Sequence, residues 1–320
     1  MGKENIIYID SNAKLQEHLP QIQSCARVAV DLEFDRNRYR YGFTLCLMQL
    51  MAGEFCYLID PLAEELDLSG IYAVFQDPSV TTVVFSFQED MMLLQSLGCR
   101  PVNLYDTGVA IRLLDSPQTS LGTVLLDLLG VEVNKDAQKS NWFNRPLTED
   151  QLTYAAQDVL HLFPLMDLIE NRIQIADRKE WVRQENLYWQ EMDYSLADQI
   201  VQLKENDKKD MNQIQWHVYG KLMELREAWA QEYNLPSGRV MRTDYVKEII
   251  VKNGLRYWEK NRSTNNAIKT AEKKALVLEE MKRAEQEALD LGLSKENSAR
   301  DRWSKEEYQK FKEEKRRKET

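Results

Sequence analysis

Cysteine and histidine are scarce in this 320-residue sequence, which contains four cysteines and three histidines. The cysteines are scattered between residues 25 and 99 without a CxxC pair, so the sequence predicts neither a zinc site nor a disulfide framework. No stretch approaches the roughly 20 consecutive apolar residues of a membrane-spanning helix, and the first residues lack the apolar core of a signal peptide. These absences favour a soluble protein of a reducing compartment, and we expect a cytoplasmic location without membrane attachment.

Positive charge is also in deficit, because 42 Lys and Arg residues face 52 Asp and Glu residues for a formal net charge of −10. Such a balance argues against a basic protein that coats nucleic acid regardless of sequence. It is compatible with a nucleic-acid enzyme whose active site is itself acidic and binds metal cations. The length and the hydrophobic content of 43% support more than one packed core, so we expect two domains.

Strand-like and helix-like segments alternate in the first half of the chain. Alternating apolar and β-branched residues predict strands at 27–35, 44–52, 54–61 and 81–87. Helical periodicity predicts helices at 67–75, 88–97, 109–114 and 120–130. Strands that first follow one another across short turns and are later separated by helices predict an α/β fold, a mixed sheet with helices packed on it.

From Glu149 the pattern is helical nearly to the end of the chain. Leu152 through Ile169 forms one apolar-faced helix that Pro164 should kink or break. The interleaved charges of the last residues predict a solvated helix or a disordered end. The expected organisation is a first domain at 1–172, linker helices at 173–211, an all-α domain at 212–290 and a charged tail at 291–320.

Four acidic residues and one tyrosine have neighbours that suggest chemistry. Asp31 and Glu33 lie two apart in a predicted strand and therefore share a face. Asp90 follows another strand, and Asp158 lies four residues after Tyr154 on a predicted helix. Clustered carboxylates repel one another and take up protons unless cations neutralise them, and Mg²⁺ prefers such oxygen ligands. With 52 acids in the chain, a single pair of this kind is more often solvated surface.

The order and surroundings of these residues resemble the DEDD-type 3′→5′ exonucleases, in the tyrosine-containing subclass and most closely the ribonuclease D family. "AVDLEFDRNRYRYGFTLCLMQL" resembles that family's first motif and "SFQEDMMLL" its second. "LLGVEVNKDAQKSNWFNRPLTEDQLTYAAQDVLHL" resembles the segment that carries the third motif. The resemblance covers about residues 5–170 and implies a ribonuclease H-like mixed sheet flanked by helices.

The resemblance also implies a hydrolysis that uses two Mg²⁺ or Mn²⁺ ions. Asp31 would bridge both ions, Glu33 and Asp158 would complete one ion's ligands, and Asp90 would support the other ion. Tyr154 would position the attacking water, and the product would be a nucleoside 5′-monophosphate. One departure is Phe85, which stands where the family's second motif often begins with histidine.

Four further residues are candidates for substrate binding. Phe34 and Met48 have side chains suited to stacking on the terminal base or sugar, with core packing the alternative for Met48. Lys135 and Arg145 precede the helix of Tyr154 and are able to bind phosphate, with solvated surface as the alternative for each.

The segment "LMELREAWAQEYNLPSGRVMRTDYVKEII" is similar to the HRDC module, a small all-α domain, over roughly residues 212–290. Its Trp229 and basic residues would either form a surface for single-stranded nucleic acid or belong to the core and the solvated exterior.

The leading hypothesis is a metal-dependent 3′→5′ exoribonuclease that binds the single-stranded 3′ end of RNA in tRNA or other structured-RNA processing. The alternatives are a 3′→5′ exonuclease acting on DNA and a non-catalytic nucleic-acid-binding protein on the same fold. No obligate protein partner is evident from the sequence.

Overall fold

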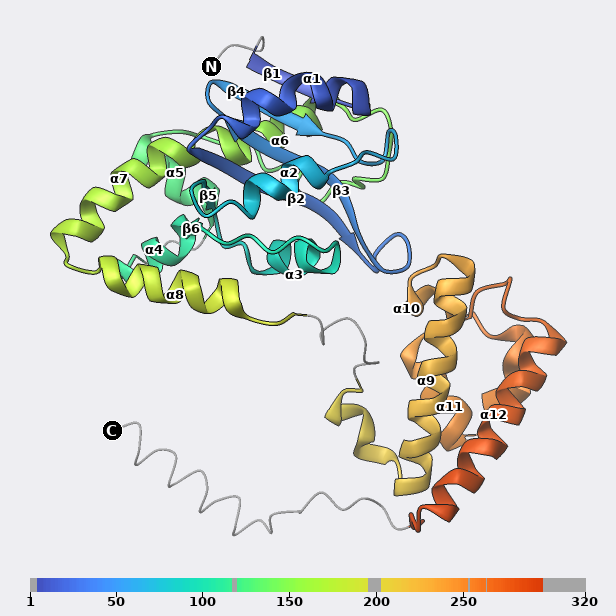
Figure 1. The fold of residues 1–320 in the computed structure, drawn as a ribbon. Coiled ribbons are helices and arrows are strands. Elements are labelled where there is room, and N and C mark those ends of the chain that lie inside the picture. The colour runs from blue at the N-terminus through green and yellow to red at the C-terminus, as the bar shows by residue number, and fades with distance from the viewer. Residues whose placement is uncertain (1–4, 117–119, 195–202, 253, 263, 296–320) are drawn as a thin grey trace, which may run out of the picture. The chain divides into compact units, whose positions relative to one another are not determined.

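The computed structural model in Figure 1 describes residues 5–116, 120–194, 203–252, 254–262 and 264–295. The chain divides into two compact units, Met1–Ile200 and Val201–Thr320. The first unit contains a six-stranded sheet with helices, and the second is helical. Among the described residues, none of the helices is apolar over a length that would cross a membrane.

The sheet of the first unit is mixed, as the sequence predicts. Its strands run in the spatial order β1-β4-β3-β2-β5-β6. The strands β2, β3 and β4 form an antiparallel meander, whereas β1, β5 and β6 join it in parallel. Their bounds are β1 Ile6–Ile9, β2 Arg27–Arg36, β3 Phe43–Ala52, β4 Phe55–Ile59, β5 Thr81–Val84 and β6 Leu104–Asp106.

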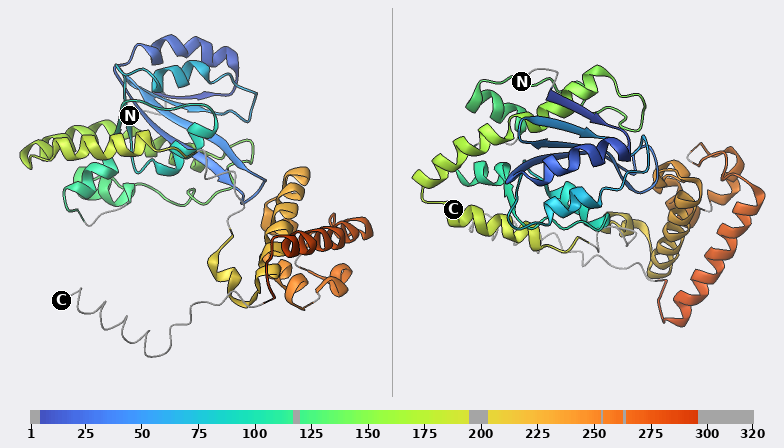
Figure 2. Two further views of the ribbon diagram at one scale, coloured as in Figure 1. Left: turned by 60° about the horizontal axis from the view of Figure 1, so that its bottom comes forward. Right: turned by 45° about the horizontal axis from the view of Figure 1, so that its top comes forward.

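Helices cover both faces of this sheet (Figures 1 and 2). One core lies between the sheet and the helices α1 (Asn12–Gln23), α2 (Ser69–Phe75) and α3 (Gln88–Ser96). The other core involves α4 (Thr107–Leu113), α5 (Leu121–Leu129), α6 (Glu149–Leu160), α7 (Leu162–Ile175) and α8 (Lys179–Glu191). The predicted helices are thus present, and β1, β6 and α1 are elements for which the sequence analysis made no prediction.

The residues of β2 alternate between these two cores. Val28, Val30 and Leu32 belong to the core under α1 to α3. Asp31 and Glu33 therefore point to the opposite face, because successive strand residues face opposite sides. The helix α6 packs across β2, β3 and β4 and supplies residues to the core on that second face. This arrangement brings the predicted strand carboxylates and the helix of Asp158 together.

The predicted strand at 81–87 ends three residues early, at Val84. Ser86 adopts a left-handed conformation with φ 55°. The carboxylate of Asp106 accepts the N–H groups of Ser86 at 2.7 Å and Phe87 at 3.0 Å, so these groups leave the sheet ladder. The same carboxylate caps α4 by accepting N–H bonds from Gly108 and Val109.

The long helix predicted over Leu152–Ile169 is two helices. α6 ends at Leu160 and α7 begins at Leu162, with Pro164 in the first turn of α7. Proline lacks an N–H and is tolerated in a first turn, where that donor has no partner within the helix. The predicted break at Pro164 is therefore confirmed, and it lies just ahead of the proline.

The second unit is all-α, as predicted, with Trp229 and Trp258 in its core. Its α-helices are α9 (Gln213–Tyr233), α10 (Ser237–Val240), α11 (Thr243–Lys252) and α12 (Ala271–Asp290), with 3₁₀ turns at Glu205–Asp210 and Gly254–Lys260. Trp229 and Arg226 are buried, so the hypothesis of an exposed basic and aromatic surface is wrong for these two residues. Most of the predicted charged tail, residues 296–320, lies outside the described residues.

A buried ion pair ties the segment before α6 to the sheet. The guanidinium of Arg145 contacts both carboxylate oxygens of Asp60, at 2.5 and 2.6 Å, and Asp60 is fully buried after β4. Tyr8 of β1 also donates to this carboxylate, and Arg145 donates to the backbone oxygens of Cys46 and Trp142. The pair therefore links three strands to the chain that leads into α6.

Replacing Arg145 with Met should destabilise the protein by about 3 kcal/mol, because it leaves the Asp60 carboxylate buried without its partner. Arg27→Gln provides a control, since the Arg27–Asp167 pair is largely exposed and should contribute about 1 kcal/mol or less. Urea denaturation of the two variants checks the difference. An equal loss in both variants would contradict the anchoring role of the buried pair.

Candidate metal centre

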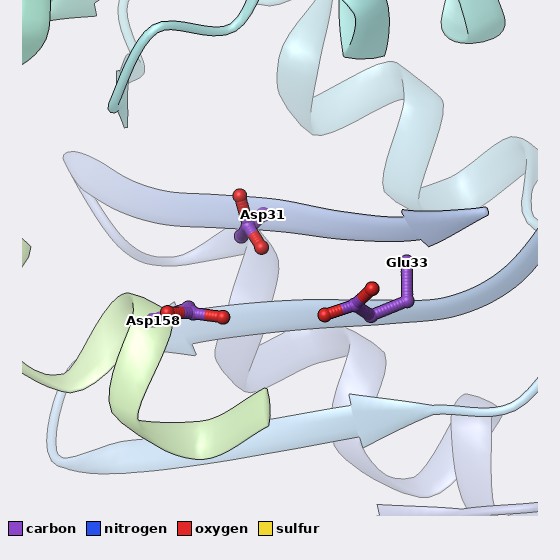
Figure 3. Close-up of side chains that lie close together, drawn as sticks. All are labelled: Asp31, Glu33 and Asp158. Carbon is purple, nitrogen blue, oxygen red and sulfur yellow. The ribbon is translucent and has the colours of Figure 1, made fainter. Parts of the chain in front are cut away.

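Three carboxylates converge between the sheet and α6. Asp31 and Glu33 project from β2, and Asp158 projects from α6 toward them (Figure 3). One carboxylate oxygen from each residue lies within 4.8 Å of the others. The sequence predicted that Asp158 would meet Asp31 and Glu33, which precede it by 125 positions or more. The packing of α6 on β2 brings the three residues together.

Asp90, the fourth predicted acid, lies beside this group but is not one of the three. It occupies the first turn of α3 and is buried. Its charge is close enough to raise the pKa values of Asp31 and Glu33. A cation held by the three clustered oxygens would therefore not have Asp90 among its nearest ligands. A second cation, held by Asp31 and Asp90, would have it as a ligand.

Burial and mutual repulsion make the carboxylates weak acids. Burial is the main cause, and it raises the pKa values of Asp90 and Asp158 from 3.8 to about 7. Burial and the charges of the neighbouring carboxylates raise the pKa values of Asp31 and Glu33 well above their usual range. Such a set of groups favours either protons or hard cations, and oxygen-only ligands suit Mg²⁺ or Mn²⁺.

Tyr154 stands on α6 one turn before Asp158, within hydrogen-bonding reach of its carboxylate. Burial, followed by the charge of Asp158, raises the pKa of the tyrosine hydroxyl. The hydroxyl consequently keeps its proton and can donate a hydrogen bond or orient a water molecule. The ring of Trp142 lies 6.2 Å from the tyrosine ring and is buried, so this tryptophan packs beside Tyr154 in the core.

The two basic candidates occupy different environments. Lys135 lies close enough to Asp158 to lower the pKa of that carboxyl, and its Nζ donates to Ser120 at 3.2 Å. The location of Lys135 near Asp158 suits a phosphate-binding role, and that role stays a prediction. Arg145 has its guanidinium bound to Asp60 and to backbone oxygens, so a phosphate would have to compete with a buried ion pair. The expected phosphate contact of Arg145 is not favoured by this geometry.

The two candidates for base or sugar contact also differ. Met48 is 0% exposed and packs in the core under α1 to α3, on the face of the sheet opposite Asp31. Its predicted substrate contact is wrong, and the alternative of core packing is correct. Phe34 is partly exposed and packs edge-on against Phe43 with ring centroids 5.1 Å apart. A contact between Phe34 and the substrate stays a prediction.

Sequence reasoning missed Gln49 as a residue of this site. It lies on β3 directly opposite Asp31 and is 0% exposed. Neither its amide nitrogen nor its amide oxygen has a hydrogen-bond partner within the described parts of the chain. The available signal was a lone polar residue in the apolar strand "TLCLMQLMA", next to the strand of Asp31.

Divalent cations should stabilise the protein more at higher pH. Because folding raises the carboxyl pKa values, the metal-free protein should lose stability as the pH rises from about 4 through about 7. Cations bind the ionised form, so the increase in Tm with Mg²⁺ or Mn²⁺ should be larger near pH 8 than near pH 5. Thermal melts with and without cation measure it, with Asp158→Asn as the control. A pH-independent increase would contradict the assignment.

Solved structures share this architecture. The catalytic core of RRP6 from Trypanosoma brucei matches with a TM-score of 0.74 at 22% identity, over 90% of this chain and 82% of that one. Escherichia coli RNase D matches with a TM-score of 0.71 at 23% identity, over 88% of this chain and 75% of that one. These similarities establish a shared fold, which is the mixed sheet with flanking helices expected from the sequence.

Sequence comparison identifies the family. A curated ribonuclease D of Granulibacter bethesdensis is 29% identical over 224 residues, which cover 69% of this chain and 56% of that protein. This chain thus spans little more than half the length of that relative. The family model of the 3′-5′ exonuclease matches residues 6–174, a segment that includes all four acids and Tyr154. The chain therefore belongs to the metal-dependent 3′-5′ exonuclease family, with ribonuclease D among its relatives.

Proposed function

We propose that this protein is a 3′→5′ exoribonuclease that removes nucleotides from single-stranded RNA ends. The observation that carries the proposal is the group of three carboxylates within 4.8 Å on the exonuclease scaffold. Structural stability does not account for this group, because burying like charges together is unfavourable without cations. All four acids and the tyrosine are present, which argues against a non-catalytic protein on the same fold.

The proposed cofactor is a pair of Mg²⁺ or Mn²⁺ ions. The ligand set is carboxylate only, which suits hard cations. Brucella melitensis NrnC, which matches 61% of this chain with a TM-score of 0.50 and 22% identity, has been described with bound Mg²⁺. Asp31, Glu33 and Asp158 would hold one ion, and Asp31 with Asp90 would hold the second.

Each residue of the site has a distinct part in the proposed hydrolysis. Bound cations would stabilise the attacking and leaving oxygens of the phosphodiester. Tyr154 keeps its proton and would orient the water through its hydroxyl, held in place by Asp158. Lys135, close enough to Asp158 to lower its pKa, would attract the phosphate of the terminal nucleotide. Hydrolysis would release a nucleoside 5′-monophosphate.

The substrate proposed is the 3′ end of tRNA or of another structured RNA, and the proposed location is the cytoplasm. The relatives named ribonuclease D support an RNA substrate. Phe85 is partly buried and packs against the core next to α4 to α8, so the replacement of the usual histidine should leave the carboxylate group intact.

The test is digestion of 5′-labelled single-stranded RNA and DNA of the same sequence with Mg²⁺, with Mn²⁺ and with a chelator. The protein should shorten RNA one nucleotide at a time from the 3′ end, only with a cation present, and faster than DNA. Asp31→Asn and Asp158→Asn should abolish the reaction. Tyr154→Phe should slow it about 100-fold, because only the orienting hydroxyl is removed.

Two controls make the result interpretable. RNA with a blocked 3′ end should resist digestion, and Arg112→Gln, an exposed change on α4, should leave the rate unchanged. Cleavage that persists in both Asp31→Asn and Asp158→Asn would overturn the proposed function. Faster cleavage of DNA than of RNA would overturn the choice of substrate.

A further inference from the structure

The turn between β2 and β3 concentrates positive charge in an acidic protein. The sequence "DRNRYRYGF" places three arginines within five residues, in a chain with a formal charge of −10. Arg36 lies 3.5 Å from Glu89. Arg38 and Arg40 are exposed, and neither forms an ion pair with a carboxylate in the described parts of the chain. We call residues 36–42 the basic hairpin.

The backbone of the basic hairpin is held in place independently of its arginine head groups. Asp35 is 4% exposed, and its carboxylate accepts backbone N–H bonds from Arg38, Tyr39 and Arg40 at 3.1 to 3.3 Å. Asn37 adopts a left-handed conformation, and its side-chain oxygen accepts the N–H of Gly42 at 2.9 Å. The buried negative charge therefore organises the turn, and the exposed guanidinium groups remain available to bind a ligand.

Aromatic rings orient these guanidinium groups. The guanidinium carbon of Arg40 lies 4.3 Å from the ring centroid of Phe143, and that of Arg38 lies 5.0 Å from the centroid of Tyr39. A stacked guanidinium keeps its N–H edge free for a phosphate, and it loses less side-chain entropy when it binds. Planar guanidinium groups pair well with phosphate oxygens.

Two chain segments connect the basic hairpin to the carboxylate group. It continues β2 beyond Glu33, and Arg38 follows Glu33 by five positions, a span of at most about 17 Å. Figure 1 shows β2 and β3 extending past the other strands toward this turn. Arg40 also rests on Phe143, in the segment that leads into α6 and Asp158.

We propose that the basic hairpin binds backbone phosphates of the RNA strand on the 5′ side of the nucleotide being removed. The inference rests on the proposed exonuclease function and adds a second contact to it. The carboxylate group binds only the terminal phosphodiester through cations, and the protein's negative charge repels the rest of the strand. Arg38 and Arg40 offset this repulsion, and Tyr39 offers a ring for stacking with a base.

Arg38→Gln with Arg40→Gln should weaken RNA binding without affecting the chemical step. The KM for a long single-stranded RNA should rise about tenfold or more, with kcat unchanged. Hydrolysis of a dinucleotide, whose single phosphodiester is the one that is cleaved and which therefore has no backbone phosphate on its 5′ side, should keep its kcat/KM. In the inactive Asp31→Asn background, the slope of log affinity against log salt should fall by about 1.4, since two phosphate contacts are lost.

The matched control is Arg112→Gln with Arg172→Gln, two exposed arginines on α4 and α7 that remove the same charge. A salt slope and KM equal to those of this control would overturn the hairpin contact. If the unmodified protein cleaves no RNA but the hairpin variant still loses RNA affinity, the proposed catalytic function fails and the hairpin contact stands. If the unmodified protein cleaves RNA and the hairpin variant keeps its RNA affinity, the hairpin proposal fails and the proposed catalytic function stands.

A second inference concerns the unpartnered amide of Gln49. A buried polar group without a partner is destabilising, so its presence needs an explanation. Directly paired residues of antiparallel strands share a face with their Cβ atoms about 5 Å apart, and Gln49 is paired with Asp31. The side chain of Gln49 therefore leaves the sheet next to that of Asp31, the residue that is common to both proposed cation positions.

We infer that Gln49 is a positioning residue whose amide N–H donates to the ionised Asp31. That bond would leave the other lone pairs of Asp31 directed at the cations, as outer hydrogen-bond partners do in metal sites. The inference rests on the proposed cofactor.

Gln49→Met, of similar length and without polar atoms, should lower Mn²⁺ affinity about 10- to 100-fold by calorimetric titration. The free energy of unfolding without metal should not fall, because an unsatisfied buried amide is removed. Gln49→Leu should show the same changes, and it replaces Gln49→Met in the test if that variant folds poorly. Met48→Leu, the neighbour on the other face, should keep its metal affinity.

Unchanged Mn²⁺ affinity in either Gln49 variant would overturn this role. A loss of stability equal to the loss of metal-binding free energy would also overturn it, because it would indicate a packing role. Absence of Mn²⁺ binding in the unmodified protein would instead defeat the proposed cofactor.

Discussion

Repulsion between buried carboxylates is the constraint on which the candidate site depends. Asp31, Glu33 and Asp158 meet where burial penalises charge, and the charge of Asp158 raises the pKa values of both Asp31 and Glu33. Without cations such a group adds no stability to the protein, because its carboxyl groups are then either protonated or repel one another. The fold holds the group together by other means, and those means lie outside the site.

Two rigid parts supply that support. The meander of β2, β3 and β4 sets the register that places Asp31 and Glu33 on one face. α6 is held across this meander by its apolar residues and by the Arg145–Asp60 pair at its approach. Asp158 and Tyr154 are delivered by one helix, so their geometry relative to each other follows from helical spacing. Their geometry relative to β2 follows from packing.

In the first unit, negative charge is concentrated in the carboxylate group, and positive charge lies at Lys135 and in the basic hairpin. The carboxylate group needs cations before it can accept a phosphate. Lys135 stands beside it, and the basic hairpin stands further along β2 with Arg38 and Arg40 exposed. Asp35 shows why a count of charges is insufficient, because its carboxylate is used up on backbone N–H groups of that hairpin. An acidic net charge therefore coexists with an exposed basic turn between β2 and β3.

Periodicity and motif spacing are properties of the chain itself. The local sequence pattern was therefore sufficient to predict the alternating elements, the mixed sheet, the break near Pro164 and the motif residues. It misjudged Met48, since the face of a strand that becomes core depends on which helices pack there. It offered Arg145 for phosphate and overlooked Gln49, since the ion pair of Arg145 with Asp60 and the register of Gln49 opposite Asp31 both arise only in the tertiary structure. The sequence alone determined which acids were available, and the tertiary structure alone decided their distances, their burial and hence their affinity for protons or cations.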